Sequence, residues 1–124
     1  MTRLAAADLS PDDQALVAKA TMRAAGFLGL TNATLSKVLG VSESQVSRLA
    51  RGKAPLDGKA FELGLMLVRL FRSLAGVIGD DKEAVKSWLG TPNMALGDRP
   101  IDMIQTISGL FEVVTYVDSH RAIL

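Results

Sequence analysis

The stretch from Thr34 to Gly52, with the sequence TLSKVLGVSESQVSRLARG, constrains the fold more than any other part of the chain. Gly40 lies near its middle, where a left-handed helix end favours glycine because glycine has no Cβ to clash. Ser42 follows as the expected N-cap of the next helix. The apolar residues on either side recur at helical spacing: Leu35, Val38, Leu39, Val46 and Leu49. This pattern predicts a helix-turn-helix, although short helices joined by a glycine turn also occur in ordinary helical bundles.

The second helix of this unit would turn a polar face outward, which is the layout of a helix that lies in the major groove of DNA. Gln45 can pair with adenine and Arg48 with guanine, while Arg51 and Lys53 should meet phosphates. Glu43 argues mildly against this, because an acid in the first turn repels phosphate, although it can read cytosine. A solvated helix face is the alternative for Arg48 and Arg51. The candidate DNA-binding residues are Ser42, Ser44, Gln45, Ser47, Arg48, Arg51 and Lys53.

Charge is distributed unevenly along the chain. The total is +1, but residues 1–79 hold ten Lys and Arg against six Asp and Glu, whereas residues 80–124 hold four against seven. The basic part contains the candidate recognition helix, as attraction to phosphate requires. The acidic part is a poor surface for DNA and a better one for protein.

Several classes of protein are disfavoured by what the sequence lacks. There is no cysteine, and the single histidine is His120, so we expect no disulfide, no metal site, no cofactor and no catalysis. The N-terminus lacks the apolar core of a signal peptide. The most apolar stretch, residues 60–78, is interrupted by Glu62, Arg69 and Arg72, so we expect a buried or dimer-interface helix rather than a membrane span. A cytoplasmic protein with no membrane association is therefore expected.

The remaining sequence predicts further helices. Ser10 and Pro11 mark the start of a helix that runs to about Ala25 and is ended by Gly26 and Gly29, after a frayed arm of residues 1–9. Its expected packing residues are Ala15, Leu16, Ala18, Ala20, Met22 and Phe27. After a loop at residues 53–58, a long helix is expected over residues 59–78. It has two apolar stripes, one of Phe61, Leu65, Val68 and Phe71 and one of Leu63, Leu67, Leu70 and Leu74. These indicate burial on two sides or one wide core.

After Gly79, we expect a helix capped by Asp80 or Asp81 and broken at residues 90–93, and then a loop over residues 94–100. The next helix should span residues 101–107, with an apolar face that continues to about residue 119. Gly109 either interrupts this helix or lies where another part of the protein packs closely against the helix. The predicted fold is all-α, with a helix-turn-helix lobe (1–57), a connecting or dimerisation helix (58–79) and a small C-terminal lobe (80–124).

Two parts of the chain together resemble a known family. The back half carries, in order, Trp88-Leu89, Pro92-Asn93, Leu96-Gly97, Arg99-Pro100 and a helix with Thr106, Gly109 and Val113. This order resembles the toxin-binding domain of the MbcA/ParS/Xre antitoxin family, and the front half resembles that family's Xre-like helix-turn-helix. The resemblance covers about residues 10–119. The chain departs from the family pattern at its end, which reads HRAIL, where many members carry a glycine and an aromatic residue.

The resemblance implies an antitoxin of a bacterial type II toxin–antitoxin pair, with an all-α fold and no catalytic activity. Its partner would be a RES-domain toxin that consumes NAD or transfers a group from it. The antitoxin would block the toxin's NAD-binding cleft through its C-terminal region. It would form a homodimer and repress its own operon by binding promoter DNA. The alternative is a stand-alone dimeric repressor whose C-terminal lobe serves only dimerisation or a small ligand.

The candidate toxin-binding residues follow from the same resemblance. Gly97 and Pro100 should hold a tight, rigid loop that presents Asp98 and Arg99, unless the loop is a mere connector. Trp88 could instead be a core residue. Asn93 could bond to the loop backbone, and the tail could simply fray. The candidates are Trp88, Asn93, Leu96, Gly97, Asp98, Arg99, Pro100, His120, Arg121, Ile123 and Leu124.

Overall fold

The computed structural model describes the backbone of residues 10–123 and the side chains of residues 10–120. Its helices are α1 (Pro11–Leu28), α2 (Asn32–Leu39), α3 (Glu43–Ala50), α4 (Gly58–Ile78), α5 (Lys82–Gly90), α6 (Pro100–Met103) and α7 (Ile107–Ile123). Over the described range, the only β-structure is an isolated bridge between Asn93 and Asp98. The prediction of an all-α fold is confirmed. In this range, no helix combines the length and the apolar character that crossing a bilayer would demand.

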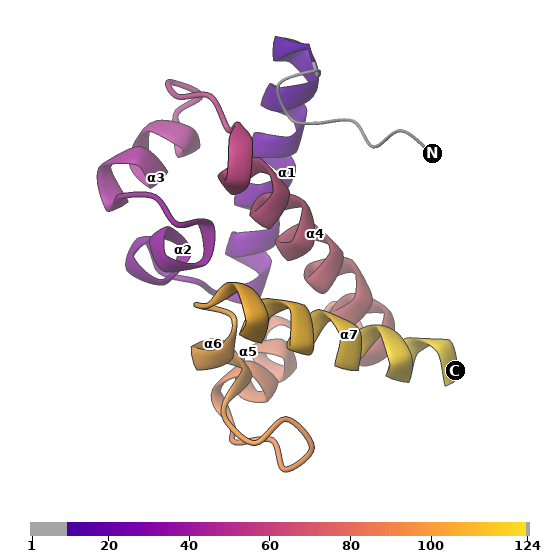
Figure 1. Ribbon diagram of the computed structural model, residues 1–124. Coiled ribbons are helices and arrows are strands. Elements are labelled where there is room, and N and C mark those ends of the chain that lie inside the picture. Colours follow the sequence, from indigo (N-terminus) through magenta and orange to yellow (C-terminus); the bar gives the residue numbers. More distant parts are fainter. Residues whose placement is uncertain (1–9, 124) are drawn as a thin grey trace.

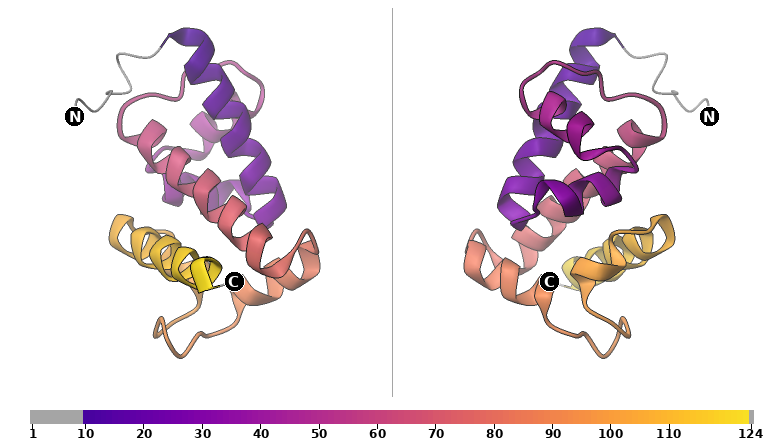
Figure 2. Two further views of the ribbon diagram at one scale, coloured as in Figure 1. Left: turned by 90° about the vertical axis from the view of Figure 1, so that its right-hand side faces the viewer. Right: turned by 90° about the vertical axis from the view of Figure 1, so that its left-hand side faces the viewer.

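The helices form two groups that share α4. In Figure 1, α1, α2 and α3 surround the first half of α4, while α5, α6 and α7 gather around its second half. The side views in Figure 2 show α4 running from the upper group into the lower one. The most extensive packing of α4 is against α1 on one side and α7 on the other. A single apolar core nevertheless continues through both groups. The long helix is therefore buried on two sides, as one alternative predicted, and also belongs to one wide core, as the other predicted.

Helix α1 begins as expected but ends later. Ser10 Oγ accepts a hydrogen bond from a first-turn N–H at 3.2 Å. The predicted end near Ala25 is wrong, because the helix passes through Gly26 and stops at Gly29, whose φ is 72°. Keeping the last turn helical buries Leu28, which outweighs a glycine cost of about 1 kcal/mol. Residues 1–9, expected to form an arm, lie outside the described residues.

The predicted packing face of α1 is partly wrong. Leu16 is 68% exposed and Ala15 is also exposed. The buried residues of this helix lie in its second half: Thr21, Ala24, Ala25 and Leu28. The first turns of α1 extend beyond the other helices (Figure 1), so only later turns meet the core.

The two apolar stripes of α4 differ in burial. One stripe is fully buried: Leu63, Leu67, Leu70 and Leu74. On the other stripe, Phe61 is buried, Val68 and Phe71 are partly buried, and Leu65 is 46% exposed. At Gly64 the helix approaches α1 so closely that a Cβ would lie 2.7 Å from Thr21 Oγ1. Such close packing fixes the helix-turn-helix group on α4.

The C-terminal group contains a break that the sequence did not reveal. Asp81 caps α5 through hydrogen bonds from two backbone N–H groups. The predicted helix over residues 101–107 is wrong, because α6 ends at Met103 and α7 begins at Ile107. Gly109 lies inside α7, where a Cβ would meet the Met103 carbonyl oxygen at 1.9 Å. Gly109 therefore does not interrupt the helix, and the Met103 backbone packs closely against it. Helix α7 extends past residue 119 to Ile123.

Candidate functional sites

The helix-turn-helix is held by local capping and by a shared apolar core. Gly40 takes a φ of 70° at the end of α2, and the Gln45 N–H donates to Ser42 Oγ at 3.1 Å at the start of α3. The side chains between the two helices are buried: Leu35, Leu39, Val46 and Leu49. This packing leaves the opposite side of α3 facing outward (Figure 1).

The outward side of α3 carries the residues predicted to contact DNA. Ser42, Ser44 and Arg48 are exposed, whereas Gln45 and Ser47 are half-buried. The Arg48 guanidinium donates a hydrogen bond to Gln45 Oε1 at 2.8 Å. The two side chains expected to read bases are thus joined in the free protein. Ser42 Oγ is engaged as a cap, so its hydroxyl is less available to DNA than that of Ser44.

A tight turn after α3 places two further cations at its end. Gly52 has a φ of 68°, and the Lys53 N–H donates to the Arg48 carbonyl oxygen at 2.8 Å. Arg51 and Lys53 are both exposed. This short basic edge next to the recognition helix is suited to phosphate contact.

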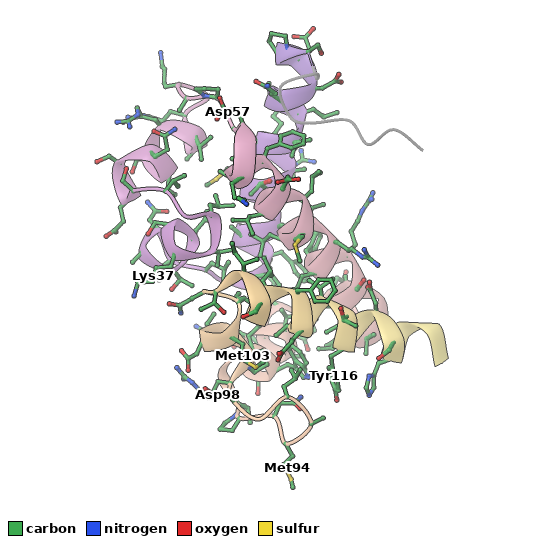
Figure 3. The ribbon with its side chains drawn as sticks, in the orientation of Figure 1. Lys37, Asp57, Met94, Asp98, Met103 and Tyr116 are labelled. Atoms are coloured by element: carbon green, nitrogen blue, oxygen red, sulfur yellow. The ribbon has the colours of Figure 1, made fainter. Side chains whose placement is uncertain are left out.

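One basic residue of the same surface was missed by the sequence reasoning. Lys37 is exposed on α2, the first helix of the helix-turn-helix, and Figure 3 shows its side chain pointing away from that helix. The first helix of such a unit crosses the DNA backbone, so a cation there can meet a phosphate. The feature of the sequence that could have identified Lys37 is its position in the first helix, between the buried Leu35 and Val38.

In the C-terminal group, Asn93 organises a tight turn. Its Oδ1 accepts hydrogen bonds from Ala95 N–H at 3.0 Å and Leu96 N–H at 3.1 Å. Its backbone carbonyl accepts from the Gly97 N–H at 2.8 Å, and Gly97 has a φ of 91°. Asn93 therefore bonds the loop backbone, as one alternative held. The turn raises Met94, which is 100% exposed, at its tip (Figure 3); the sequence reasoning missed this residue.

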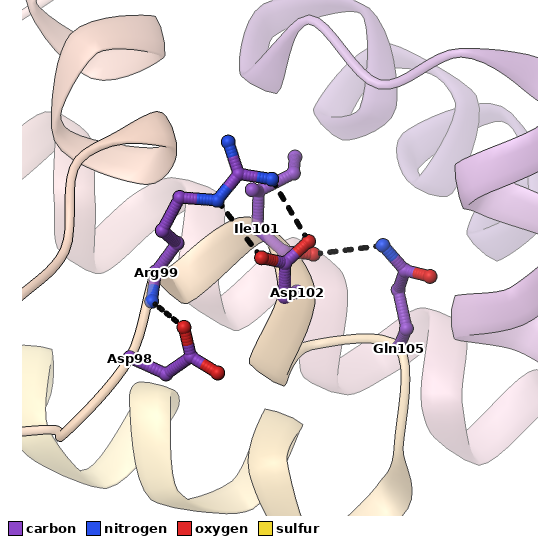
Figure 4. Close-up of polar contacts among 5 residues, drawn as sticks. All are labelled: Asp98, Arg99, Ile101, Asp102 and Gln105. Carbon is purple, nitrogen blue, oxygen red and sulfur yellow. Dashed lines mark hydrogen bonds and ion pairs between the residues drawn. The ribbon is translucent and has the colours of Figure 1, made fainter.

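The residues that follow the turn hold an arginine in a defined place, as Figure 4 shows. The Arg99 N–H donates to Asp98 Oδ1 at 2.7 Å. The Arg99 guanidinium donates two hydrogen bonds to the Asp102 carboxylate, at 2.8 and 3.1 Å. These bonds from Arg99 hold the pKa of Asp102 below its ordinary value. Asp98 and Arg99 are exposed and Pro100 is buried, so the segment is both a packed connector and a presenting loop.

An aromatic row joins α5 to α7. Trp88 stacks on Tyr116 with ring centroids 6.5 Å apart and planes inclined by 19°. The His120 ring lies 4.2 Å from the Tyr116 ring, centroid to centroid. Trp88 and Tyr116 are half-buried and His120 is exposed. Figure 3 shows Tyr116 pointing from α7 toward the side where the turn with Met94 lies. Tyr116, which connects two of the predicted residues, was not predicted.

The structure thus brings together most of the predicted C-terminal residues on one group of helices. Leu96 is half-buried and Gly97 is exposed in the turn. The side chains of Arg121 and Ile123, and the whole of Leu124, lie outside the described residues. Within the part of the chain that is described, no three His, Asp or Glu residues are grouped so that they could hold a metal ion.

Comparison with known families gives two matches that divide the chain. Residues 7–69 match the antitoxin Xre-like helix-turn-helix domain, which alone covers half of the sequence. Residues 73–122 match the antitoxin Xre/MbcA/ParS C-terminal toxin-binding domain. A search of curated proteins found no match. All of the candidate DNA-binding residues fall in the first matched range, and all of the candidate toxin-binding residues except Ile123 and Leu124 fall in the second.

Proposed function

We propose, because this chain belongs to the Xre/MbcA/ParS family of antitoxins, that it neutralises a RES-domain toxin that consumes NAD and represses its own operon. The family's domains are non-enzymatic, and the chain has a helix-turn-helix domain and a toxin-binding domain. A toxin and DNA are therefore its two kinds of partner. We propose that the toxin is a RES-domain protein, that this chain blocks the toxin's active site, and that it regulates its own operon.

The observation that carries the proposal is that α4 separates two candidate binding surfaces. One surface is the outward face of α3. The other combines the Asn93 turn with the aromatic row of Trp88, Tyr116 and His120 on the group around α5 and α7. Because the two surfaces belong to opposite ends of α4 (Figure 1), one chain can hold DNA and a toxin at once. We assign residues 1–57 to the DNA-binding lobe, 58–79 to the connecting helix and 80–124 to the toxin-binding lobe.

On the toxin side, the C-terminal lobe would contribute Arg99 and the end of the chain. Arg99 is held by Asp102 and can meet an acidic or carbonyl group of the toxin without first being ordered. Helix α7 leads toward Arg121, Ile123 and Leu124, which we propose enter the toxin's NAD-binding cleft. An arginine there would suit acidic catalytic residues.

On the DNA side, Gln45 and Arg48 would exchange their mutual hydrogen bond for contacts with base edges. Arg51, Lys53 and Lys37 would meet phosphates on either side of the groove. One short recognition helix supplies little affinity, and helix-turn-helix proteins commonly bind two half-sites as dimers. We therefore propose that the chain binds promoter DNA as a homodimer.

The decisive experiment is coexpression with the neighbouring reading frame. Cells that express this frame alone should lose NAD and stop growing, and coexpression of the full chain should restore both. A matched control is the Arg48→Ala variant, which should still rescue growth. Retention of promoter binding without any rescue would instead identify a stand-alone repressor. Equal growth and equal NAD with and without the chain would overturn the toxin assignment.

A further inference from the structure

A pocket lies between the end of α4, helix α5 and the start of the turn that Asn93 organises. It has a volume of about 410 Å³ and is open to solvent, which places it at the small end of the roughly 300–1,000 Å³ that ligand pockets span. We call it the α4–α5 pocket. Its wall comes chiefly from three neighbouring parts of the chain: Ile78 on α4, Ala84 and Trp88 on α5, and Thr91, Pro92 and Asn93 after α5.

The apolar part of the pocket is incompletely covered by the rest of the protein. Ile78, Ala84 and Trp88 are all half-buried, although Ile78 and Trp88 also pack against the apolar core. Met94, which follows Asn93 in the chain, is 100% exposed at the tip of the adjoining turn (Figure 3). Removing this apolar surface from water would stabilise a complex, so the pocket is suited to an apolar side chain.

Two residues of the pocket carry unused hydrogen-bond donors. The Asn93 Oδ1 already accepts two backbone N–H groups of the turn, which leaves the amide nitrogen, a donor, for other partners. Neither this nitrogen nor the indole nitrogen of Trp88 forms a hydrogen bond with a described residue, and neither is sealed from solvent. An indole N–H and an amide nitrogen can only donate, so a partner must supply the acceptors.

Both donor residues are held in place before a partner arrives. The Trp88 ring stacks on Tyr116 with planes inclined by 19°, and the Asn93 side chain is fixed by hydrogen bonds of 3.0 and 3.1 Å. Tyr116 does not line the pocket, so the stacking leaves part of the indole free to face a partner. Groups that are ordered in advance lose little conformational entropy on binding. Tryptophan residues at pockets of this kind often dominate the energetics of an interface.

The charge around the pocket favours a neutral acceptor over a carboxylate. Within the described part of the chain, none of the lining residues is charged. The segment that joins Ile78 to Ala84, residues 79–83, carries three acids and one lysine, so a carboxylate would be repelled. A backbone carbonyl oxygen needs no opposite charge and accepts a hydrogen bond from either donor. The pocket is therefore complementary to an apolar side chain that is flanked by backbone carbonyl groups.

We infer that the α4–α5 pocket receives an apolar side chain, such as leucine, from an exposed loop of the toxin, and that backbone carbonyl oxygens beside it accept hydrogen bonds from Trp88 and Asn93. The inference rests on the proposed function. All lining residues of the pocket lie within residues 73–122, which match the toxin-binding domain. A small molecule suits the pocket less well, because such ligands bury most of their surface and this pocket is open.

The chemistry of the pocket is tested first without the toxin, by NMR titration of the isotopically labelled full chain. The probe is N-acetyl-leucine N′-methylamide, which carries an apolar side chain between two backbone carbonyl groups. Trp88 is the single tryptophan, so one indole N–H signal reports on the pocket. We expect this signal and the Asn93 amide signals to shift, with a Kd on the order of millimolar, while the Asn32 amide signals stay unchanged. The glycine analogue, which lacks the side chain, and N-acetyl-leucine, which ends in a carboxylate, should bind more weakly.

The contact with the toxin is tested by calorimetric titration of the full chain with the protein encoded by the neighbouring reading frame. Ala84→Leu fills the pocket and should weaken binding about tenfold or more, whereas Ala33→Leu, the same change at an exposed position on α2, should have no effect. Trp88→Phe keeps an aromatic ring beside Tyr116 and removes the indole donor, so binding should weaken roughly three- to tenfold. Asn93→Asp keeps the acceptor of the turn and loses the donors, so its affinity should lie between those of wild type and Asn93→Ala.

Two results would overturn the inference. One is an indole signal of the wild-type chain that does not move in the leucine titration. The other is an Ala84→Leu variant that keeps its helices by circular dichroism and binds the toxin as tightly as wild type. If Ala84→Leu loses its helices, Trp88→Phe takes its place in this comparison. Failure of the proposed function is read separately: a neighbouring protein that does not bind the wild-type chain contradicts the proposed toxin, and the leucine titration then decides alone whether the pocket has the inferred chemistry.

Discussion

The hydroxyl of Ser73 in α4 donates a hydrogen bond to the carboxylate of Asp118 in α7, 45 residues further along the chain. Ser73 is buried, and Arg69 adds an ion pair to the same carboxylate. This contact fixes α7 to the long helix that also carries the helix-turn-helix. A polar contact at this position sets the register of the two helices more narrowly than leucine packing alone.

Replacing Asp118 by alanine should destabilise the protein. The change leaves the buried Ser73 hydroxyl without its acceptor, at a cost of about 1–3 kcal/mol in the free energy of unfolding. Urea unfolding followed by the fluorescence of Trp88, the single tryptophan, measures this. Glu112→Ala, an exposed acid on the same helix, is the control and should change the free energy by less than about 0.5 kcal/mol. Equal effects of the two variants would contradict a specific role for the Ser73–Asp118 bond.

Replacing Arg48 by alanine should impair promoter binding and spare neutralisation of the toxin. A lost bidentate base contact costs about 1–3 kcal/mol, which corresponds to roughly five- to 150-fold weaker binding per recognition helix. A gel shift at fixed salt, together with growth rescue, measures the two activities. Arg23→Ala on α1, also an exposed arginine, is the matched control. An unchanged gel shift for Arg48→Ala would eliminate its base-reading role.

Alanine should have opposite effects at two helical glycines. At Gly109 a Cβ would lie 1.9 Å from the Met103 carbonyl oxygen, so the backbone between α6 and α7 must shift and the melting temperature should fall. At Gly26 the same Cβ meets no atom within 4 Å. There alanine should stabilise α1 by about 0.5–1 kcal/mol, because glycine is a poor helix former. Thermal unfolding of both variants would refute this account if Gly109→Ala melted at or above the wild-type temperature.

Replacing Asn93 should loosen the exposed turn without unfolding the lobe. Asn93→Ala removes the acceptor for the Ala95 and Leu96 N–H groups, at a net cost of about 1 kcal/mol for each bond. Asn93→Asp places a carboxylate oxygen where the amide oxygen accepts these bonds, so this variant should retain the turn. Calorimetric titration with the toxin should then show weaker binding for Asn93→Ala than for Asn93→Asp. Equal weakening by both would mean that the amide contacts the toxin directly.

Several features of the fold could be predicted because they depend on neighbouring residues. The turn at Gly40, the Ser42 cap and the start of α1 at Pro11 all arise from hydrogen bonds within about four residues. The end of α1 was misplaced because a local glycine signal was outweighed by the burial of Leu28, a contact made with other helices. The break between Met103 and Ile107 was missed because the apolar pattern continues across it, although Thr106 Oγ1 accepts a hydrogen bond from the Gly109 N–H at the start of α7.

The candidate site residues also divide into those that the local sequence predicts and those that depend on contacts in the folded protein. Arg48 and Lys53 could be found from their positions in the helix-turn-helix. The detailed arrangement of these side chains could not be predicted, because the hydrogen bond between Arg48 and Gln45 depends on side-chain conformation. Tyr116 was missed because its partner, Trp88, lies 28 residues away in the sequence, and no local pattern connects them.

The helical class of the fold, the starts of most helices and the order of a helix-turn-helix before a more acidic lobe could all be derived from the amino-acid sequence. Helix caps and apolar spacing are local, so their free energies hardly depend on the rest of the fold. Which apolar residues are buried depends instead on how the helices pack against one another. Leu67 is buried and Leu65 exposed although they lie two residues apart, because burial depends on where α1 and α7 cross α4. Packing between distant segments therefore left Leu65 exposed on the long helix.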